Sequence, residues 1–319
     1  MKFTIDFGAE TLNCEIVGPE GAPVVAVLGG ISADSHVTSS EDDSAAGWWE
    51  AVVGAGKGID TQRFRVLSID YAVRPVISTR DQADALALAL DFAGVDRLHA
   101  LVGASYGGMV ALAFGVSHAA RTGRLVVIGA GHEADPMATA LRVLQRRVIE
   151  LGKSVDRARD GVVLARALAM TTYGTPAEFA SRFSPAPHDA AHDQVFPVEE
   201  YLLRAGERFA NDCSAERYLA LSLSLDLHRI RPEDVRVPTT LITAPDDRIV
   251  PRSQMLDLAR RLGASCEVVE LRSHYGHDAF LREPREISAV LTTILDAMHS
   301  SRATTIQRRS RSRAEVGTP

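Results

Sequence analysis

The hydrophobic positions along the chain follow two kinds of pattern. Short, almost continuous apolar runs are typical of strands buried on both faces of a sheet, and the stretches between several of them repeat with the helical period. Residues 2–7 and 13–17 instead alternate like an outer pair of strands. This order predicts an α/β fold, with a mostly parallel sheet covered by helices on both faces. The predicted buried strands are residues 24–28, 65–69, 98–102, 125–128, 239–243 and 266–271, and helices are predicted at residues 81–94, 109–118 and 251–262.

The alternation breaks between about residues 132 and 235, where only helical periodicities occur. We therefore predict a core formed by residues 1–131 and 235–300, and a helical cap of residues 132–234 inserted between its strands. Such a cap would lie over the carboxyl ends of the strands, where open α/β sheets bind their ligands. The helical periodicities within it cover residues 137–152, 156–170, 176–183, 198–210 and 216–227.

Composition and charge narrow the class of protein. The 319 residues are 46% hydrophobic, the apolar runs are far too short for a membrane span, and Asp6 interrupts the amino terminus before a signal-peptide core could form. Three cysteines without a CxxC spacing predict neither a disulfide frame nor a metal site, and they suit the cytoplasm. Residues 301–319 carry a net charge of +4 and read as a disordered basic tail. The rest of the chain is strongly acidic and would repel nucleic acid.

The segment 103–108, with the sequence GASYGG, carries the clearest chemical signal. It follows a predicted strand and opens a predicted helix, which is the context of a nucleophile elbow built on G-x-S-x-G. Side chains two residues before and after the serine must be absent for the strand and the helix to pass one another. The pattern predicts Ser105 as the nucleophile.

A serine hydroxyl needs a base to take its proton and an acid to orient that base, and in this context they follow in the order acid, then histidine. The loop after the strand at 239–243 offers Asp246 and Asp247. We favour Asp247, because its spacing to the following Val-Pro and helix fits better. The loop after the last strand offers His274 and His277, of which we favour His277, preceded by Gly276.

The tetrahedral intermediate of acyl transfer carries an oxyanion that needs two backbone N–H donors. One is expected from Tyr106, directly after the nucleophile. The other is expected from the turn after the strand at 24–28, where Ile31 is the best candidate.

Several segments resemble the homoserine O-acyltransferases of the α/β-hydrolase superfamily. The resemblance covers about residues 15 to 290, and its most specific stretches are AGWWEAVVGAGKGIDT at 46–61 and HYGHDAFL at 274–281. It implies an acyl-CoA donor, L-homoserine as acceptor, a role in methionine biosynthesis and a homodimer. We expect no cofactor and no metal. The other matching segments are GGISADSH at 29–36, GASYGG at 103–108, LARALAMTTY at 164–173, FPVEEYL at 196–202 and YLALSLSLDLH at 218–228.

Site residues follow from the resemblance position by position. It implies that Ser105, Asp247 and His277 form the triad, and that Ile31 and Tyr106 form the oxyanion hole.

The resemblance also implies three substrate-binding residues. Arg166 and Tyr173 match positions over the substrate pocket, and Asp278 matches the acid that binds the acceptor's amino group. An amino acid acceptor brings an ammonium and a carboxylate, and a pocket that excludes water must answer them with an acid and an arginine.

The chain departs from the family at a few positions. Family members usually read GGSMGG at the elbow, where this chain has Ala104 and Tyr106. A short segment at 71–78 replaces a long glycine-rich one, and Gly174 stands where the family has arginine. We expect these changes to surround the acyl pocket, and the resemblance leaves acetyl-CoA and succinyl-CoA open as donors.

Other functions are compatible with the same residues. A plain esterase or thioesterase would use the same triad with water as acceptor, since a fold does not fix a function. Serine is an alternative acceptor. A binding protein with a silent triad is the non-enzymatic alternative, against which the presence of all three triad residues in order counts.

Overall fold

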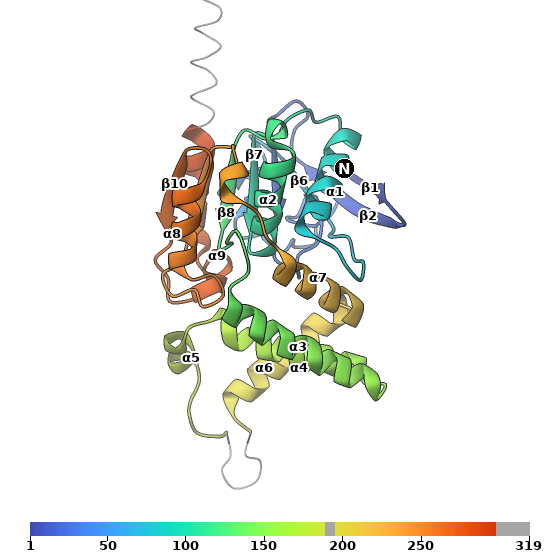
Figure 1. Ribbon diagram of the computed structural model, residues 1–319, viewed down its shortest axis with the longest axis vertical. Helices are drawn as coiled ribbons and strands as arrows, with labels where there is room; N and C mark the ends of the chain where they lie inside the picture. The colour runs from blue at the N-terminus through green and yellow to red at the C-terminus, as the bar shows by residue number, and fades with distance from the viewer. Residues whose placement is uncertain (189–194, 298–319) are drawn as a thin grey trace, which may run out of the picture.

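The computed structural model describes residues 1–188 and 195–297. Within them, eight strands form one sheet in the order β1-β2-β6-β3-β7-β8-β9-β10 (Figure 1). β1 and β2 form an antiparallel hairpin, β2 is antiparallel to β6, and the pairs from β6 to β10 are parallel. The predicted α/β class is confirmed. The bounds are β1 Lys2–Phe7, β2 Glu10–Val17, β3 Val24–Leu28, β6 Arg65–Ile69, β7 Ala100–Ala104, β8 Leu125–Ile128, β9 Thr239–Thr243 and β10 Cys266–Glu270.

The strands follow the hydrophobic pattern closely. Every residue of β3, β7, β8 and β9 is buried, as expected for central parallel strands, whereas β10 at the edge is partly exposed. Three strands differ from the prediction at their ends, and β10 differs only by ending one residue early, at Glu270. β2 begins at Glu10 because Phe7 pairs with Glu10 across a tight turn that contains Gly8 at φ +68°. β7 is shifted by two residues to Ala100–Ala104, so that it runs directly into Ser105.

Helices cover both faces of the sheet. α1 (Thr79–Phe92), α2 (Tyr106–Ser117) and α8 (Arg252–Arg261) contribute to one hydrophobic cluster, and a helix at residues 284–297 contributes to the cluster on the other face. α1 begins two residues before the predicted start because Ser78 and Asp81 form a capping box. The helix at 284–297 was not predicted. A small parallel sheet of β4 (Val53–Gly54) and β5 (Ile59–Asp60) was not predicted either.

A group of helices lies between β8 and β9 in the chain and gathers at one end of the sheet in Figure 1. The predicted helices of this region are present, and side chains cap the amino-terminal ends of some of them. Asp135 caps α3 and Thr175 caps α5 through side-chain bonds to backbone N–H groups. The division of the chain into a core and a cap domain stays a prediction. The bounds are α3 Pro136–Ser154, α4 Ala158–Tyr173, α5 Pro176–Arg182, α6 Pro197–Asp212 and α7 Ala215–Leu227.

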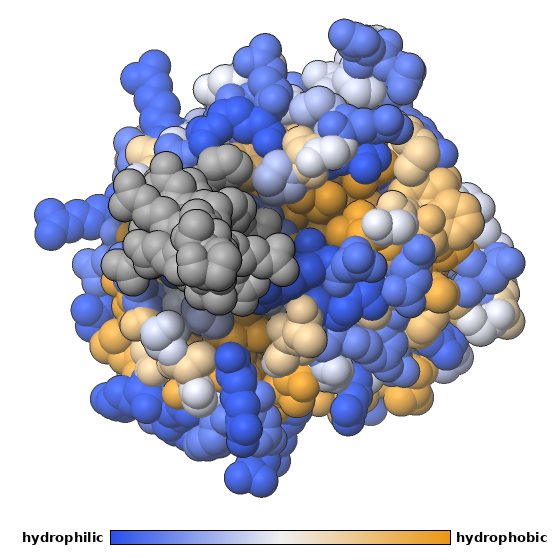
Figure 2. Space-filling view, turned by 90° about the horizontal axis from the view of Figure 1, so that it is seen from above, coloured by the Kyte–Doolittle hydropathy of each residue, from blue (hydrophilic) through white to orange (hydrophobic). Residues whose placement is uncertain are grey.

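The opposite end of the molecule is seen in Figure 2, where hydrophilic side chains project around the rim and hydrophobic residues lie in separate areas between them. None of the described helices combines the length and the apolar character needed to cross a membrane. The basic tail predicted at 301–319 lies outside the described residues.

Candidate active site

The elbow at Ser105 has a strained backbone. Ser105 joins β7 to α2 with φ 54° and ψ −118°, a backbone conformation that residues other than glycine rarely adopt. A Cβ added at Gly103 would lie 2.1 Å from the carbonyl oxygen of Gly107, and one added at Gly107 would lie 2.2 Å from that of Leu28. Both glycines are therefore required by the close passage of strand, helix and neighbouring strand.

The predicted acid, base and nucleophile form one hydrogen-bonded chain. His277 Nε2 lies 2.8 Å from Ser105 Oγ, and His277 Nδ1 lies 2.7 Å from Asp247 Oδ2. The second carboxylate oxygen of Asp247 accepts hydrogen bonds from the backbone N–H groups of Ile249 and Val250 at 2.8 and 2.9 Å. The carboxylate is thus held in place by its own loop, and it holds the imidazole against the serine.

The alternative residues lie elsewhere. Asp246 is exposed, and His274 is exposed with its ring 4.1 Å from that of Tyr275. The geometry therefore favours Asp247 over Asp246, and His277 over His274.

The charge of Asp247 acts strongly on the base. Burial disfavours protonated His277, which is only 7% exposed, but the charge and the hydrogen bond of Asp247 outweigh burial and raise the pKa of His277. A higher pKa makes the imidazole a stronger base toward Ser105 and stabilises the imidazolium once it has taken the proton.

Two backbone N–H groups beside Ser105 are free to bind an oxyanion. Those of Ile31 and Tyr106 make no hydrogen bond to any residue that the structure describes. The turn that carries Ile31 is fixed through the Gly29 carbonyl, which accepts from Gly107 N at 2.8 Å and from the Tyr71 hydroxyl at 2.6 Å. The two candidate donors are therefore held on neighbouring, mutually bonded loops, as an oxyanion hole requires.

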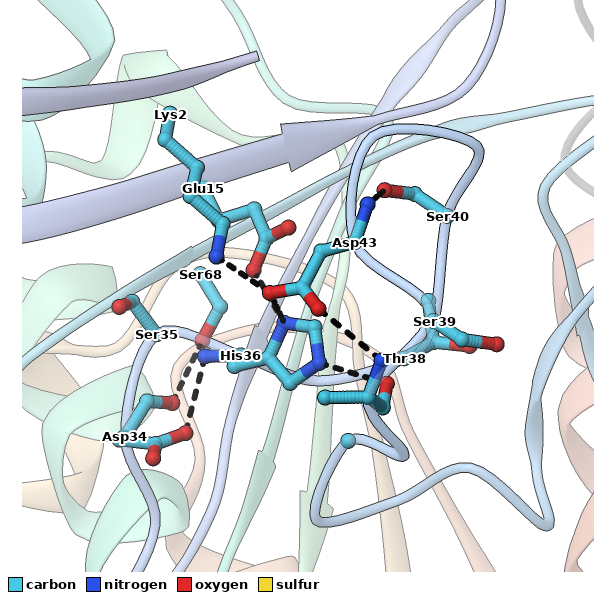
Figure 3. A network of polar contacts seen from close by, with 12 residues as sticks. Lys2, Glu15, Asp34, Ser35, His36, Thr38, Ser39, Ser40, Asp43 and Ser68 are labelled. Atoms are coloured by element: carbon cyan, nitrogen blue, oxygen red, sulfur yellow. Dashed lines mark hydrogen bonds and ion pairs between the residues drawn. The ribbon is translucent and has the colours of Figure 1, made fainter.

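The segment that follows this turn is tied to the edge hairpin by a polar network (Figure 3). His36 Nδ1 lies 2.7 Å from Glu15 Oε2, and its Nε2 lies 2.9 Å from the Ala45 carbonyl. Lys2 donates to Asp43 at 2.6 Å. These contacts anchor the loop after β3 to β1 and β2. Apart from the presence of His36 in the GGISADSH segment, no sequence pattern indicated these contacts.

A cavity of about 160 Å³ opens above Ser105 and His277, and residues of α3, α4 and α7 line its other walls. The three predicted substrate residues, Arg166, Tyr173 and Asp278, all line it. The Arg166 guanidinium lies 5.2 Å from the centre of the Tyr173 ring, and that ring lies 5.9 Å from the ring of His277. The structure therefore brings these residues together around the nucleophile.

Asp278 follows the base directly, in a short 3₁₀ turn at Gly276–Asp278. Its side chain caps no helix, although α9 (Ala279–Arg282) begins just after it. Burial raises the pKa of Asp278, and the positive charges of His277 and Arg166 oppose this shift. A partly desolvated carboxylate beside the catalytic base is suited to binding a cation.

The departures from the family pattern do not surround the cavity, so that expectation was wrong. Ala104, the Tyr106 ring and Gly174 are absent from its lining. Ala104 is buried in β7, and the Tyr106 hydroxyl instead lies 2.7 Å from Ser224 Oγ. A Cβ at Gly174 would lie 2.3 Å from Glu178 Oε2, outside the cavity.

The sequence analysis missed many of the lining residues, and two of these are buried polar residues of α3. Arg142 and Gln145 of α3 line the cavity and are 8% and 4% exposed. With Ala138 and Ile149 they form the buried face of α3, and their helical spacing is the signal that could have indicated them.

Comparisons with known proteins agree with this geometry. A family model described as alpha/beta hydrolase fold matches residues 24–284. The homoserine O-succinyltransferase of Xanthomonas campestris pv. campestris is 44% identical over 290 residues, covering 89% of this chain and 78% of that protein. The serine O-succinyltransferase of Stenotrophomonas maltophilia is 31% identical over 329 residues, covering 88% and 89%. Among solved structures, homoserine O-acetyltransferase from Bacillus anthracis superposes with a TM-score of 0.80 over 92% of this chain and 96% of that chain, at 19% identity, which is a likeness of fold.

Proposed function

The chain belongs to the homoserine O-acyltransferase family of the α/β-hydrolase superfamily, and from this premise we infer that it is an acyl-CoA-dependent enzyme that acylates the hydroxyl of L-homoserine. In this family the reaction is a step of methionine biosynthesis. We propose that Ser105, His277 and Asp247 carry it out by a ping-pong mechanism.

One observation carries the proposal. The nucleophile and base open into the same cavity as a carboxylate, Asp278, and a guanidinium, Arg166. A hydrolase needs no such pair, whereas an amino acid acceptor presents both an ammonium and a carboxylate that must be matched inside a closed pocket.

The first half-reaction acylates the enzyme. His277 Nε2, 2.8 Å from Ser105 Oγ, takes the serine proton as the oxygen attacks the thioester carbonyl. The N–H groups of Ile31 and Tyr106 bind the oxyanion that develops. The carbon–sulfur bond then breaks, His277 gives the serine proton to the departing sulfur, and CoA leaves as the free thiol, so that His277 is neutral again.

The second half-reaction transfers the acyl group. The ammonium of homoserine binds Asp278 and its carboxylate binds Arg166, which places the side-chain hydroxyl beside His277. His277 removes the hydroxyl proton as the oxygen attacks the acyl-serine carbonyl. The ester bond to Ser105 breaks, and the proton returns to Ser105 Oγ through His277.

A direct test compares acyl-CoA turnover with and without homoserine. We expect homoserine to accelerate CoA release strongly and O-acylhomoserine to be the product detected by mass spectrometry. Equal CoA release in both cases would indicate a thioesterase. Serine, offered separately, should react more slowly than homoserine; the reverse ranking would assign serine as the acceptor.

We further propose that the enzyme works as a homodimer in the cytoplasm and needs no cofactor. The family resemblance supports the dimer, and the cysteine usage supports a reducing compartment. Light scattering of the purified protein tests the dimer, and activity after dialysis against a chelator tests the absence of a metal.

A further inference from the structure

The cavity above Ser105 is lined by a second guanidinium besides Arg166, that of Arg142. Arg166 acts electrostatically on Asp278, so these two residues form one pole of the cavity. Arg142 comes from another helix, α3, and lines the cavity beside Gln145. Its hydrogen bonds within the described chain go to Asp226 and Thr139, and none goes to Arg166 or Asp278.

Arg142 is held by a network that has an excess of positive charge. Asp226 of α7 accepts from Arg142 Nε through Oδ1 and from Arg146 Nη1 through Oδ2, both at 2.6 Å. The three side chains are 10%, 14% and 6% exposed for Arg142, Arg146 and Asp226. Two guanidinium groups thus share one carboxylate in a poorly solvated site, which favours the binding of an additional anion.

The outer edge of the Arg142 guanidinium is available for that anion. Its Nη1 donates to no residue that the structure describes, and its Nη2 reaches only Thr139 Oγ1, at 3.5 Å. Gln145 accepts from the Tyr218 hydroxyl at 2.8 Å through Oε1, and its Nε2 has no partner within the described chain. Unused donors of two neighbouring side chains therefore face a cavity that also contains Ser105.

Two other carboxylates line the cavity, and both are engaged elsewhere. Asp135 accepts from the N–H groups of Met137 and Ala138 at 2.9 and 3.1 Å as the cap of α3. Glu133 forms an ion pair with Arg229 at 3.4 Å. Neither of these carboxylates contacts Arg142 or Arg146 in the described chain, so Asp226 alone pairs with the two guanidinium groups.

We propose that Arg142 binds the free carboxylate of a dicarboxylic acyl group, so that the donor is succinyl-CoA rather than acetyl-CoA. The inference rests on the proposed acyl transfer and names its donor. Succinyl carries its second carboxylate two methylenes from the thioester carbonyl, and a guanidinium binds such a carboxylate through paired N–H donors. An acetyl group would leave the donors of Arg142 and Gln145 without a partner in a desolvated site.

Arg142 acts here as a binding residue for the donor and takes no part in bond making. The bonds formed and broken are those of the first half-reaction described above, and the distal carboxylate stays ionised and bound throughout. The positive charge of Arg142 also lowers the pKa of His277, which indicates that the guanidinium lies close to the reacting centre.

The test measures acylation alone, in single turnovers without homoserine, by following CoA release and the mass of the acylated protein. Succinyl-CoA is compared with butyryl-CoA, which has the same number of acyl carbons and no carboxylate. In the unaltered enzyme we expect succinyl-CoA to acylate Ser105 about 100-fold more efficiently, which corresponds to about 2.8 kcal/mol. Equal efficiencies would overturn the inference without any variant.

Arg142→Met should remove this preference by slowing succinylation about 100-fold while butyrylation changes little. Arg146→Met is the matched control, because it removes the other guanidinium from Asp226 but does not line the cavity. It should keep the succinyl preference. Loss of the preference in both variants would show that the network, rather than Arg142, sets it, and would overturn the proposal.

A different outcome would reassign Arg142 to the acceptor. If Arg142→Met leaves succinylation unchanged and raises the KM for homoserine, then Arg142 binds the acceptor carboxylate and the inference is wrong. If neither CoA ester acylates the unaltered enzyme and no O-acylhomoserine forms, the proposed acyl transfer itself has failed, which is distinguishable from failure of the donor assignment.

Discussion

Asp278→Asn is the substitution that best separates an acyltransferase from a hydrolase on this fold. The triad and the oxyanion donors do not include Asp278, so breaking a thioester does not require its charge. Binding the ammonium of an amino acid acceptor does. The substitution preserves the size of the side chain and removes only its negative charge.

The expected loss follows from the surroundings of the carboxylate. Asp278 lies in the cavity wall, where burial raises its pKa, and Arg166 and His277 are positive charges near it. Removing one partner of a desolvated, hydrogen-bonded charge pair costs about 2–5 kcal/mol. Because Asp278 is only partly buried, we expect the lower part of that range, which is about 30-fold to 100-fold in the rate of transfer to homoserine.

Rapid quench separates the two half-reactions. The acyl-enzyme is formed with acyl-CoA, its mass is verified, and its decay is then followed at increasing homoserine concentrations. We expect transfer to fall by the factor above and acylation to change by less than about threefold, since it involves no ammonium. Asp246→Asn is the matched control, because Asp246 is an exposed aspartate on a loop next to the triad and should leave both half-reactions unchanged.

Parallel loss of acylation and transfer would refute this reasoning. The charge of Asp278 also raises the pKa of His277, so a purely electrostatic role through the base would appear as an acid shift of the acylation pH profile. A uniform decrease at the pH optimum would instead assign Asp278 to positioning His277.

The other predictions concern the triad and the elbow. Ser105→Ala should abolish labelling by a fluorophosphonate and lower turnover by about 10³-fold or more, with unchanged folding by circular dichroism; retention of a tenth of the activity would contradict the assignment. Acylation should be lost as the pH falls through the raised pKa of His277, because the base must be neutral. In Asp247→Asn the residual acylation should be lost at a lower pH, since the charge that raises the pKa of His277 is gone. An unchanged pH dependence would show that another group titrates. Gly107→Ala should lower the free energy of unfolding by about 1–3 kcal/mol in urea denaturation, because its Cβ would lie 2.2 Å from the carbonyl oxygen of Leu28, and an unaltered midpoint would disprove that close contact.

The elements and the reacting residues could be predicted because their signals are local. A strand buried on both faces, such as β9 at Thr239–Thr243, needs an apolar run, and an elbow needs small residues at fixed distances from its serine. The choice of Asp247 over Asp246 also rested on local spacing. The physical reason for this choice is seen only in the structure, where Asp247 Oδ1 accepts hydrogen bonds from two successive backbone N–H groups of its own loop.

The surroundings of Arg142 could not be predicted because they are created by distant parts of the chain. Helix α3 carries several arginines, and an arginine on a helix usually faces solvent. Arg142 is buried by its contact with Asp226, 84 residues later on α7, together with the packing of α7 against α3. The helical spacing from Ala138 and Ile149 places Arg142 on the inner face of α3 and Arg147 on the outer face, where Arg147 pairs with Glu150. That spacing does not show which group a buried guanidinium contacts.

Two departures from the family pattern meet in one contact of the fold. The short segment after β6 begins with Tyr71, and the elbow carries Tyr106; their rings pack edge to face at 4.8 Å. The Tyr71 hydroxyl donates to the Gly29 carbonyl, which also accepts from Gly107 N. Neither tyrosine ring lines the cavity, so these changes do not shape the acyl pocket. They instead hold in place the turn after β3 that carries Ile31. A chain that lacks the long glycine-rich segment of its family can thus hold the turn beside Ser105 through a buried aromatic pair.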